Sequence, residues 1–363
     1  MQKKLIALAV AGLVSAPAFA QSNVTIYGVA DAGIGFGSHG DNDFNGVLSG
    51  VLSSSRIGFK GTEDLGNGLK AVFVLEQGFD IGNGVASPAV GSAEAAVDKN
   101  GKVIVDGDSV FSRQAYVGLG GAFGTVALGR QYAPGYFFNY DAMPAASVGP
   151  QSILSNGAGM TITPNSTARW DNSLTYTGSF SGLTARAIYS ANAVETELNP
   201  EDDDAYGLGL NYSNGPLSVG AVYQVVQNNA EDQEEWGVGG SYNFGFLTVA
   251  GSYQAVDGLK FGAGQEADLW QVGVIVPVGA AGKVHLAYGE YDRDDLANAG
   301  AESYSLAYTH ALSKRTTAYA GWNRTDNDNG LELGLVGYIQ PAGATTYGGD
   351  ESDLFFVGMR HTF

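Results

Sequence analysis

The sequence of 363 residues contains no cysteine, and only 15% of its residues are charged. Without cysteine, the chain has neither a disulfide framework nor a cysteine-based zinc site. Long hydrophobic runs are missing as well: after Ala20, no stretch approaches the ~18 uninterrupted apolar residues of a transmembrane helix. Any residence in a membrane therefore requires another architecture.

Basic residues are also few. Lysines and arginines number 18 against 37 aspartates and glutamates, which gives a net charge of −19. Loss of the first twenty residues, which hold two lysines and no acid, leaves 16 basic against 37 acidic residues and a charge of −21. Because phosphate groups are bound by clustered cations, this acidity argues against nucleic acid as a partner.

The first twenty residues have the organisation of a secretory signal peptide. Lys3 and Lys4 form a basic start, and residues 5–14 form an apolar stretch too short to span a bilayer. Ala18-Phe19-Ala20 then makes a cleavage site before Gln21. We therefore expect residues 1–20 to be removed and residues 21–363 to form one mature domain.

The remaining chain is a succession of segments in which apolar and small or polar residues alternate. In one of them, Tyr206, Leu208 and Tyr212 alternate with Gly207 and Asn211. This period of two predicts β-strands with one apolar face, and a β-sandwich would show it too. The segment length of about ten residues and the aromatics near segment ends instead favour tilted strands that cross a membrane.

Short and long connections alternate strictly between these segments. Seven short turns each join two strands, and the first and last strands bring the total to sixteen, the size at which a barrel leaves an aqueous channel. The sequence thus predicts an all-β, sixteen-stranded antiparallel transmembrane barrel, with acidic, glycine-rich long loops outside. The short turns are Asp64–Gly68, Gly120–Gly124, Phe180–Gly182, Ser213–Pro216, Asn243–Gly245, Val278–Gly282 and Leu312–Arg315.

One long connection, Gln131–Ala168, shows neither strand alternation nor a helical stripe. A loop of this length in a compact domain is functional, disordered, or a sign of a wrong strand assignment. We expect it to fold inward and narrow the water-filled barrel. Other long loops are rich in acids and include Glu231, Asp232, Glu234 and Glu235.

Several stretches resemble the general porins of Gram-negative outer membranes, in particular the trimeric porins of β-proteobacteria and neisseriae. They are SNVTIYGVADAG, SRIGFKGTEDLGNGLKAVFVLEQGF, FSRQAYVGLGGAFGTVALGRQY, NSLTYTG and the final FFVGMRHTF. The resemblance covers essentially the whole mature chain. It implies a homotrimer in outer-membrane lipid and lipopolysaccharide, passive diffusion of small ions and hydrophilic solutes, and Phe363 as an assembly signal.

Strand parity places several charges inside the barrel, because a charge on the lipid face at mid-depth costs roughly 2–4 kcal/mol. Arg56 and Lys60 alternate with Ile57 and Phe59. By the same argument, we expect the lumen to contain Glu76, Arg169 and Arg186.

The resemblance adds a constriction in which arginines of the wall face acids of the inward loop. Arg56 and Arg169 match this pattern best, and Arg113 and Arg130 are further candidates. Parity conflicts for the latter two, so they could also lie at a trimer interface. Asp141, the only acid in Gln131–Ala168, is the expected opposing charge. A basic constriction favours anions over the screened charges of outer loops, and similar porins often prefer anions.

Other functions find weaker support. An enzyme on a smaller barrel needs a nucleophile or an acid–base set at the rim, and no histidine stands in a recognisable motif. Residues 41–46 match the start of a calcium loop, but its twelfth position is Leu52 rather than glutamate. An adhesin or receptor barrel acting through acidic loops remains an alternative. We expect no cofactor and no resident metal.

Overall fold

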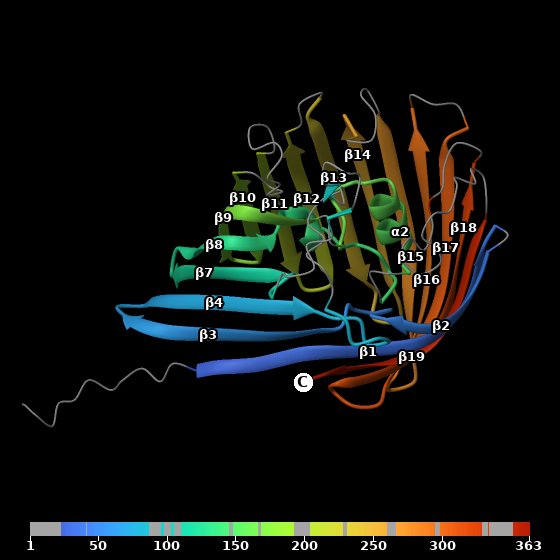
Figure 1. Ribbon diagram of the computed structural model, residues 1–363, viewed down its shortest axis with the longest axis horizontal. Coiled ribbons are helices and arrows are strands. Elements are labelled where there is room, and N and C mark those ends of the chain that lie inside the picture. Colours follow the sequence, from blue (N-terminus) through green and yellow to red (C-terminus); the bar gives the residue numbers. More distant parts are fainter. Residues whose placement is uncertain are drawn as a thin grey trace, which may run out of the picture.

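The computed structural model describes residues 23–40, 42–86, 96–97, 103–104, 110–144, 148–165, 168–191, 204–227, 231–259, 266–294, 298–328, 333 and 351–363. Most of them belong to one antiparallel sheet (Figure 1). Neither helix in this part of the chain has the length and hydropathy to cross a membrane. The proposed signal peptide, residues 1–20, lies outside the described residues.

Seventeen strand segments make up the sheet, and successive strands pair with each other except the second and third, which both pair with the first. A separate pair, β5 (Ala96–Val97) and β6 (Val103–Ile104), flanks the sequence Asn100-Gly101, a dipeptide favoured in two-residue hairpin turns. The strands of the sheet are β1 (Asn23–His39), β2 (Asn42–Ser49), β3 (Arg56–Gly66), β4 (Leu69–Gly78), β7 (Gln114–Gly121), β8 (Gly124–Tyr132), β9 (Arg169–Phe180), β10 (Leu183–Ser190), β11 (Ala205–Asn214), β12 (Leu217–Val226), β13 (Gln233–Asn243), β14 (Thr248–Asp257), β15 (Ala267–Val278), β16 (Gly282–Arg293), β17 (Gly300–Ala311), β18 (Thr316–Asn327) and β19 (Ser352–Thr362).

The sheet closes into a ring because the last strand pairs with the first. Residues 29–39 of β1 pair with residues 352–362 of β19. On its other edge, β1 pairs first with β3 and then with β2, so β2 and β3 together occupy one position of the ring. The seventeen segments therefore form a closed barrel of sixteen strands, which confirms the predicted fold.

The seven predicted short turns all join paired neighbours, from the β3–β4 hairpin to the β17–β18 hairpin. Several use the left-handed conformation: Asn67 has φ 53° and Ser181 φ 50°, each next to a glycine of positive φ. Asparagine and glycine tolerate this region, and such turns match the twist of a hairpin. The local sequence thus accounts for the short turns of the barrel.

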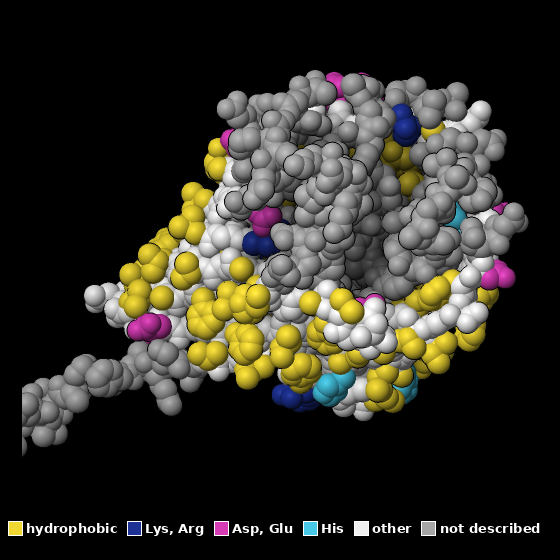
Figure 2. Space-filling model, in the orientation of Figure 1, with side chains coloured by type: hydrophobic (Ala, Val, Ile, Leu, Met, Phe, Trp, Pro, Cys, Tyr) yellow, Lys and Arg dark blue, Asp and Glu magenta, His cyan; other side chains and the backbone are white. Residues whose placement is uncertain are grey.

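Outward-facing side chains are apolar and exposed, as a lipid-facing surface requires. Val117, Leu128, Val238, Leu286 and Val357 are each between 45% and 59% exposed. Figure 2 shows hydrophobic side chains gathered over the outer surface. The lumen-facing positions of the same strands are polar residues, glycines and some apolar residues such as Leu354 and Phe356, and inward-folded parts of the chain bury many of them.

Aromatic side chains on the outer surface near the long loops donate hydrogen bonds to carboxylates. Tyr189 Oη donates to Asp204 at 2.7 Å, and Trp322 Nε1 donates to Asp353 at 3.0 Å. Tyr223 Oη donates to Glu234 at 3.1 Å. These pairs mark the level where the apolar band gives way to a charged rim, the place of an interfacial aromatic girdle.

In the described part of the chain, two segments between strands fold into the barrel. The longer one follows β8 and contains a short 3₁₀-helix, η1 (Pro134–Phe137), and an α-helix, α2 (Pro150–Gly157), which lies against β15, β16 and β17 (Figure 1). The shorter one, residues 50–55, connects β2 with β3 and was not predicted. Both helices of the longer segment begin at proline, whose fixed φ suits a helix start.

Glycines of the wall make room for the longer segment. A Cβ at Gly209 would lie 2.9 Å from Pro134, and one at Gly220 would lie 2.5 Å from the Tyr140 hydroxyl. A Cβ at Gly273 would lie 2.5 Å from Ala142. Contacts this short are essentially never seen for a real Cβ, so the segment contacts the bare backbone of the wall.

Candidate functional site

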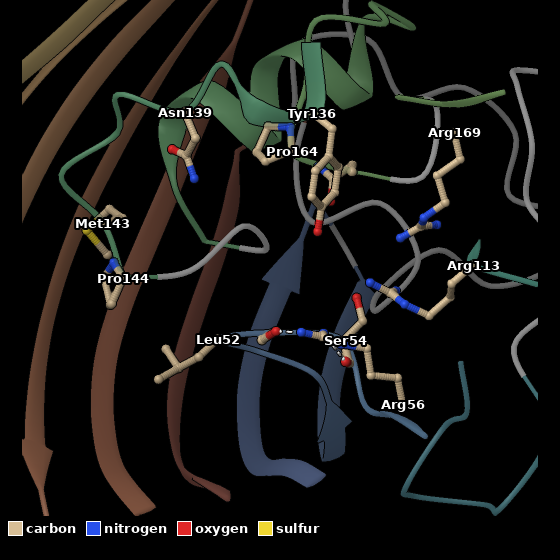
Figure 3. A pocket seen from close by; sticks show the side chains of 12 residues that line it. Leu52, Ser54, Arg56, Arg113, Tyr136, Asn139, Met143, Pro144, Pro164 and Arg169 are labelled. Carbon is tan, nitrogen blue, oxygen red and sulfur yellow. Dashed lines mark hydrogen bonds between the residues drawn. The ribbon is translucent and has the colours of Figure 1, made fainter. Parts of the chain in front are cut away.

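A polar cavity of about 210 Å³ lies between the two inward-folded segments and the wall of β3, β7 and β9. Figure 3 shows Arg56, Arg113 and Arg169 on one side of it, with Met143 and Pro144 on the other. It is lined by Leu52, Ser53, Ser54, Arg56, Arg113, Tyr136, Asn139, Met143, Pro144, Pro164, Asn165 and Arg169. Three guanidinium groups from three strands or strand ends therefore share one space.

Glu76 on β4 forms ion pairs with two of these arginines, Arg56 and Arg113. Its Oε1 lies 2.7 Å from Arg113 Nε, and its Oε2 lies 3.5 Å from Arg56 Nε. The Tyr27 hydroxyl also donates to Glu76 at 2.9 Å. Glu76 is 3% exposed and does not line the cavity. Its charge therefore offsets part of the positive charge of the arginines, while its carboxylate cannot contact a solute in the cavity.

Arg169, the first residue of β9, is placed by aromatic rings. Its guanidinium lies over the Tyr132 ring, 5.3 Å from the centroid. The Tyr132 ring in turn stacks on Tyr136 at 3.7 Å between centroids. A cation over an aromatic face is attracted by the ring quadrupole, which supports this orientation.

The side chain of Arg56 is oriented by the shorter inward segment. Arg56 Nη1 donates to Ser53 Oγ and to the Ser54 carbonyl, each at 2.9 Å. Asn139 and Asn165 of the longer segment complete the polar lining. The arginines thus face hydroxyl and amide groups, and none of the described lining residues carries a carboxylate.

The other predicted cations lie apart from this cavity. Arg130 forms an ion pair with Asp171 at 2.6 Å and donates from Nε to the Ser112 carbonyl. Lys60 lies over the ring of Tyr27. Arg186 lies over Phe137, 4.2 Å from its centroid, in a smaller pocket.

The parity conflict at Arg113 and Arg130 has a structural cause. Arg113 precedes the first residue of β7, so strand alternation does not apply to it. Between Gly129 and Gln131 the β8–β9 register shifts, with Gly129 at φ 128° and Asn172 of the partner strand at φ 47°. A bulge of this kind re-aims side chains, which is why alternation assigned no consistent face to Arg130.

Asp141 does not lie opposite the arginines. Its carboxylate accepts hydrogen bonds from the backbone N–H of Met143 at 2.8 Å and of Gln151 at 3.1 Å, and it does not line the cavity. Asp141 therefore joins two parts of the inward segment. Desolvation of its carboxyl raises the pKa to about 6, although both hydrogen bonds favour the ionised form.

The raised pKa of Asp141 predicts a pH-dependent stability. A group whose pKa is raised by folding stabilises the fold fully below its unfolded pKa of ~4, and this stabilisation is lost as pH rises through about 6. We expect the unfolding temperature, relative to that of Asp141→Asn, to fall across this window. Thermal unfolding in detergent followed by tryptophan fluorescence measures it. A difference independent of pH would contradict the assignment.

A row of wall residues binds the inward segment, and this row was not predicted. Gln224 of β12 accepts from Gly135 N–H at 2.5 Å, and Glu235 of β13 accepts from Thr161 N–H at 2.6 Å. Further along, Gln254, Gln271, His285 and Ser305 contact the carbonyls of Ile162, Tyr140, Ala142 and Val148. Glu235 was expected in a solvated acidic loop; it is instead a buried residue of a strand.

The alternation of inward and outward residues along the strands could have predicted this row from the sequence. Gln224 lies at an inward-facing position of β12, whose outward residues include Val219 and Tyr223. Glu235 likewise faces inward, because the next residue, Trp236, is 45% exposed on the outer surface. Large polar side chains at the lumen-facing positions of successive strands indicate that a segment of the chain lies inside the barrel and is bound by them. Among the described residues, no group of three acids or histidines is arranged to hold a metal ion.

Comparison with known proteins decides the family. The family model described as Gram-negative porin matches residues 7–330. The chain belongs to the Gram-negative porin family. It is 33% identical to outer membrane porin protein 32 of Delftia acidovorans and 32% identical to an outer membrane porin protein of Bordetella pertussis, over the whole of each chain. Major outer membrane protein P.IB of Neisseria meningitidis is 30% identical over 60% of this porin and 57% of the relative.

The fold of the porin also matches a solved structure. The anion-selective porin from Comamonas acidovorans superimposes with a TM-score of 0.74 at 29% identity, covering 94% of this chain and all of the other. These findings confirm the predicted resemblance. The protein is an outer-membrane porin, a channel protein rather than an enzyme, whose barrel passes ions and small hydrophilic solutes by passive diffusion.

Proposed function

We propose that the cavity beside Arg56, Arg113 and Arg169 is the constriction of this channel and that it favours anions. The observation that carries the proposal is the grouping of three guanidinium groups around one space, with no carboxylate among the described residues of its lining. Rings of charged groups at a narrow point select ions of opposite sign. Glu76 behind the wall offsets only part of this positive charge.

Two further facts support the anion preference. The inward segment that carries Asn139 and Asn165 brings neutral amides, so the field across the cavity is set by arginine. The solved structure with a TM-score of 0.74 is titled as an anion-selective porin. In contrast, most of the excess negative charge of this chain is not at the cavity, and charges beyond ~8 Å are screened at physiological salt.

We also propose that the porin is a homotrimer in lipopolysaccharide-containing outer membrane, that residues 1–20 are its signal peptide, and that residues 131–168 form the constriction loop. A structural match at 15% identity is titled as a trimer form, and it supports the fold alone. The exposed apolar band with its aromatic rim supports insertion in lipid.

The deciding experiment is single-channel recording of the purified porin in a planar bilayer under a salt gradient. Stepwise conductance in groups of three supports the trimeric pore, and a reversal potential of the sign set by anion flux supports the basic constriction. Cation-dominated flux would contradict the anion preference. Folded but silent protein would favour an adhesin or receptor barrel that acts through its loops.

Glu76→Gln tests the charge balance of the cavity. The amide oxygen keeps an acceptor for Arg113 Nε, and the amide nitrogen can donate to the Tyr27 hydroxyl, but the substitution removes the negative charge that partly neutralises Arg56 and Arg113. We expect the anion-to-cation permeability ratio to rise about twofold, because one screened charge near the path contributes less than ~1 kcal/mol. Reversal potentials measure the ratio, with Glu302→Gln on the outer surface as control.

A further inference from the structure

Three carboxylates hold the inward-folded segments without lining the cavity. Asp31 of β1 is fully buried, Glu235 of β13 is 1% exposed, and Asp141 belongs to the longer inward segment. Each accepts hydrogen bonds from two backbone N–H groups of an inward-folded segment. The same chemical device therefore occurs at three separate points of the structure.

Asp31 binds the shorter segment. Its Oδ2 accepts from the N–H groups of Leu52 and Ser53, both at 2.8 Å, and its Oδ1 accepts from the Tyr319 hydroxyl at 2.6 Å. Leu52 and Ser53 line the cavity, and Ser53 is an acceptor for Arg56. A shift of this segment would consequently move both a wall of the cavity and one of its arginines.

Glu235 binds the longer segment. Its Oε1 accepts from Thr161 N–H at 2.6 Å, from Thr161 Oγ1 at 2.8 Å and from Gln233 Nε2 at 2.7 Å, while its Oε2 accepts from Ile162 N–H at 2.8 Å. Pro164, which lies two residues beyond Ile162, lines the cavity. Asp141 does the same for Met143, another lining residue.

We propose that Asp31, Asp141 and Glu235 are positioning residues that set the bore of the channel by holding the backbones of the cavity walls. This inference rests on the constriction proposed above. Carboxylates with several N–H donors form stronger hydrogen bonds than neutral acceptors, so each fixes its segment at a defined distance from the arginines. The three groups hold the walls while the arginines determine ion preference.

Glu235 offers the sharpest test because its sequence neighbour is a matched control. Glu234 faces outward and accepts from the Tyr223 hydroxyl, so Glu234→Gln removes the same charge from the other side of the wall. We expect Glu235→Leu to change single-channel conductance and to raise open-channel current noise about fivefold, since several hydrogen bonds to the segment are lost. Glu235→Gln should lie between, and Glu234→Gln should match the parent.

The reversal potential separates positioning from charge sensing. In Glu235→Leu it should stay near the parent value, because Glu235 does not line the cavity and the segment that it holds contains no lysine or arginine. Thr161→Val removes one donor to Glu235 from the segment side and should raise the noise less, which keeps the test informative if Glu235→Leu fails to fold.

Two results would overturn the inference. One is parental noise and conductance in both Glu235→Leu and Thr161→Val. The other is a shift of reversal potential in Glu235→Leu as large as that produced by removing a cavity arginine, which would make Glu235 a charge of the pathway. Both readouts are independent of the proposed anion preference, which the reversal potential of the parent porin tests by itself.

Discussion

Replacing Arg169 by glutamine is expected to reduce the anion-to-cation permeability ratio about fivefold. A guanidinium at the wall of the cavity, screened by salt, changes the energy of a passing ion by about 1 kcal/mol. Arg169 is the best choice because Glu76 keeps both of its ion-pair partners in this variant, whereas loss of Arg113 would leave a buried carboxylate with a weaker partner. Reversal potentials under a salt gradient measure the effect.

Arg186→Gln is the matched control for this variant. Arg186 is also an arginine of the barrel wall, but it lies over Phe137 in a separate pocket and does not line the cavity. Its replacement should shift the reversal potential by less than half as much. Equal shifts would show that charge anywhere in the lumen sets the preference, and would contradict a local constriction at the three arginines.

Gly28→Val is expected to have the largest effect on the stability of the barrel. A Cβ at Gly28 would lie 2.4 Å from the Phe363 ring and 2.6 Å from the Arg56 carbonyl oxygen, at the point where the last strand closes onto the first. Overpacking of this kind destabilises by about 1–3 kcal/mol, and more where backbone must move. Denaturant unfolding in detergent and the amount of heat-resistant barrel measure the loss.

Gly46→Val in β2 is the control, since a Cβ there meets only the Phe44 ring at 3.3 Å. In protein refolded in detergent, Gly28→Val should cost less stability in a Phe363→Ala background than in the parent, because the valine then meets only the Arg56 backbone. A Gly28→Val barrel as stable as the parent would contradict the tight closure. An equal cost in both backgrounds would place the clash at Arg56 alone.

The strands could be predicted from sequence because each is encoded locally. Alternation of Tyr206, Leu208 and their neighbours, and turns with asparagine or glycine such as Asn67, depend only on residues near in sequence. Counting these turns was enough to obtain sixteen strands. The family motifs then identified Arg56 and Arg169, which the structure places around the same cavity.

The interior could not be predicted in the same way because its contacts join distant residues. Glu235 binds Thr161, 74 positions away, and Asp31 accepts from Tyr319, 288 positions away. In the sequence, Glu235 is one of several acids in an acidic run. Asp141 is the only acid of residues 131–168, and it was assigned to the constriction because the resemblance to porins implies an acid in that loop. Parity also fails where the backbone leaves the strand conformation, as at Gly129.

The wall glycines that contact the longer inward segment suggest how pore size can change in the evolution of such channels. A single added methyl group at Gly209, Gly220 or Gly273 would press on Pro134, Tyr140 or Ala142 and push the segment away from the wall. Each such change would narrow the proposed constriction without replacing any of the three arginines in its wall. A lineage of these channels could therefore adjust the molecular sieve and the ion filter by separate mutations, on opposite sides of the same opening.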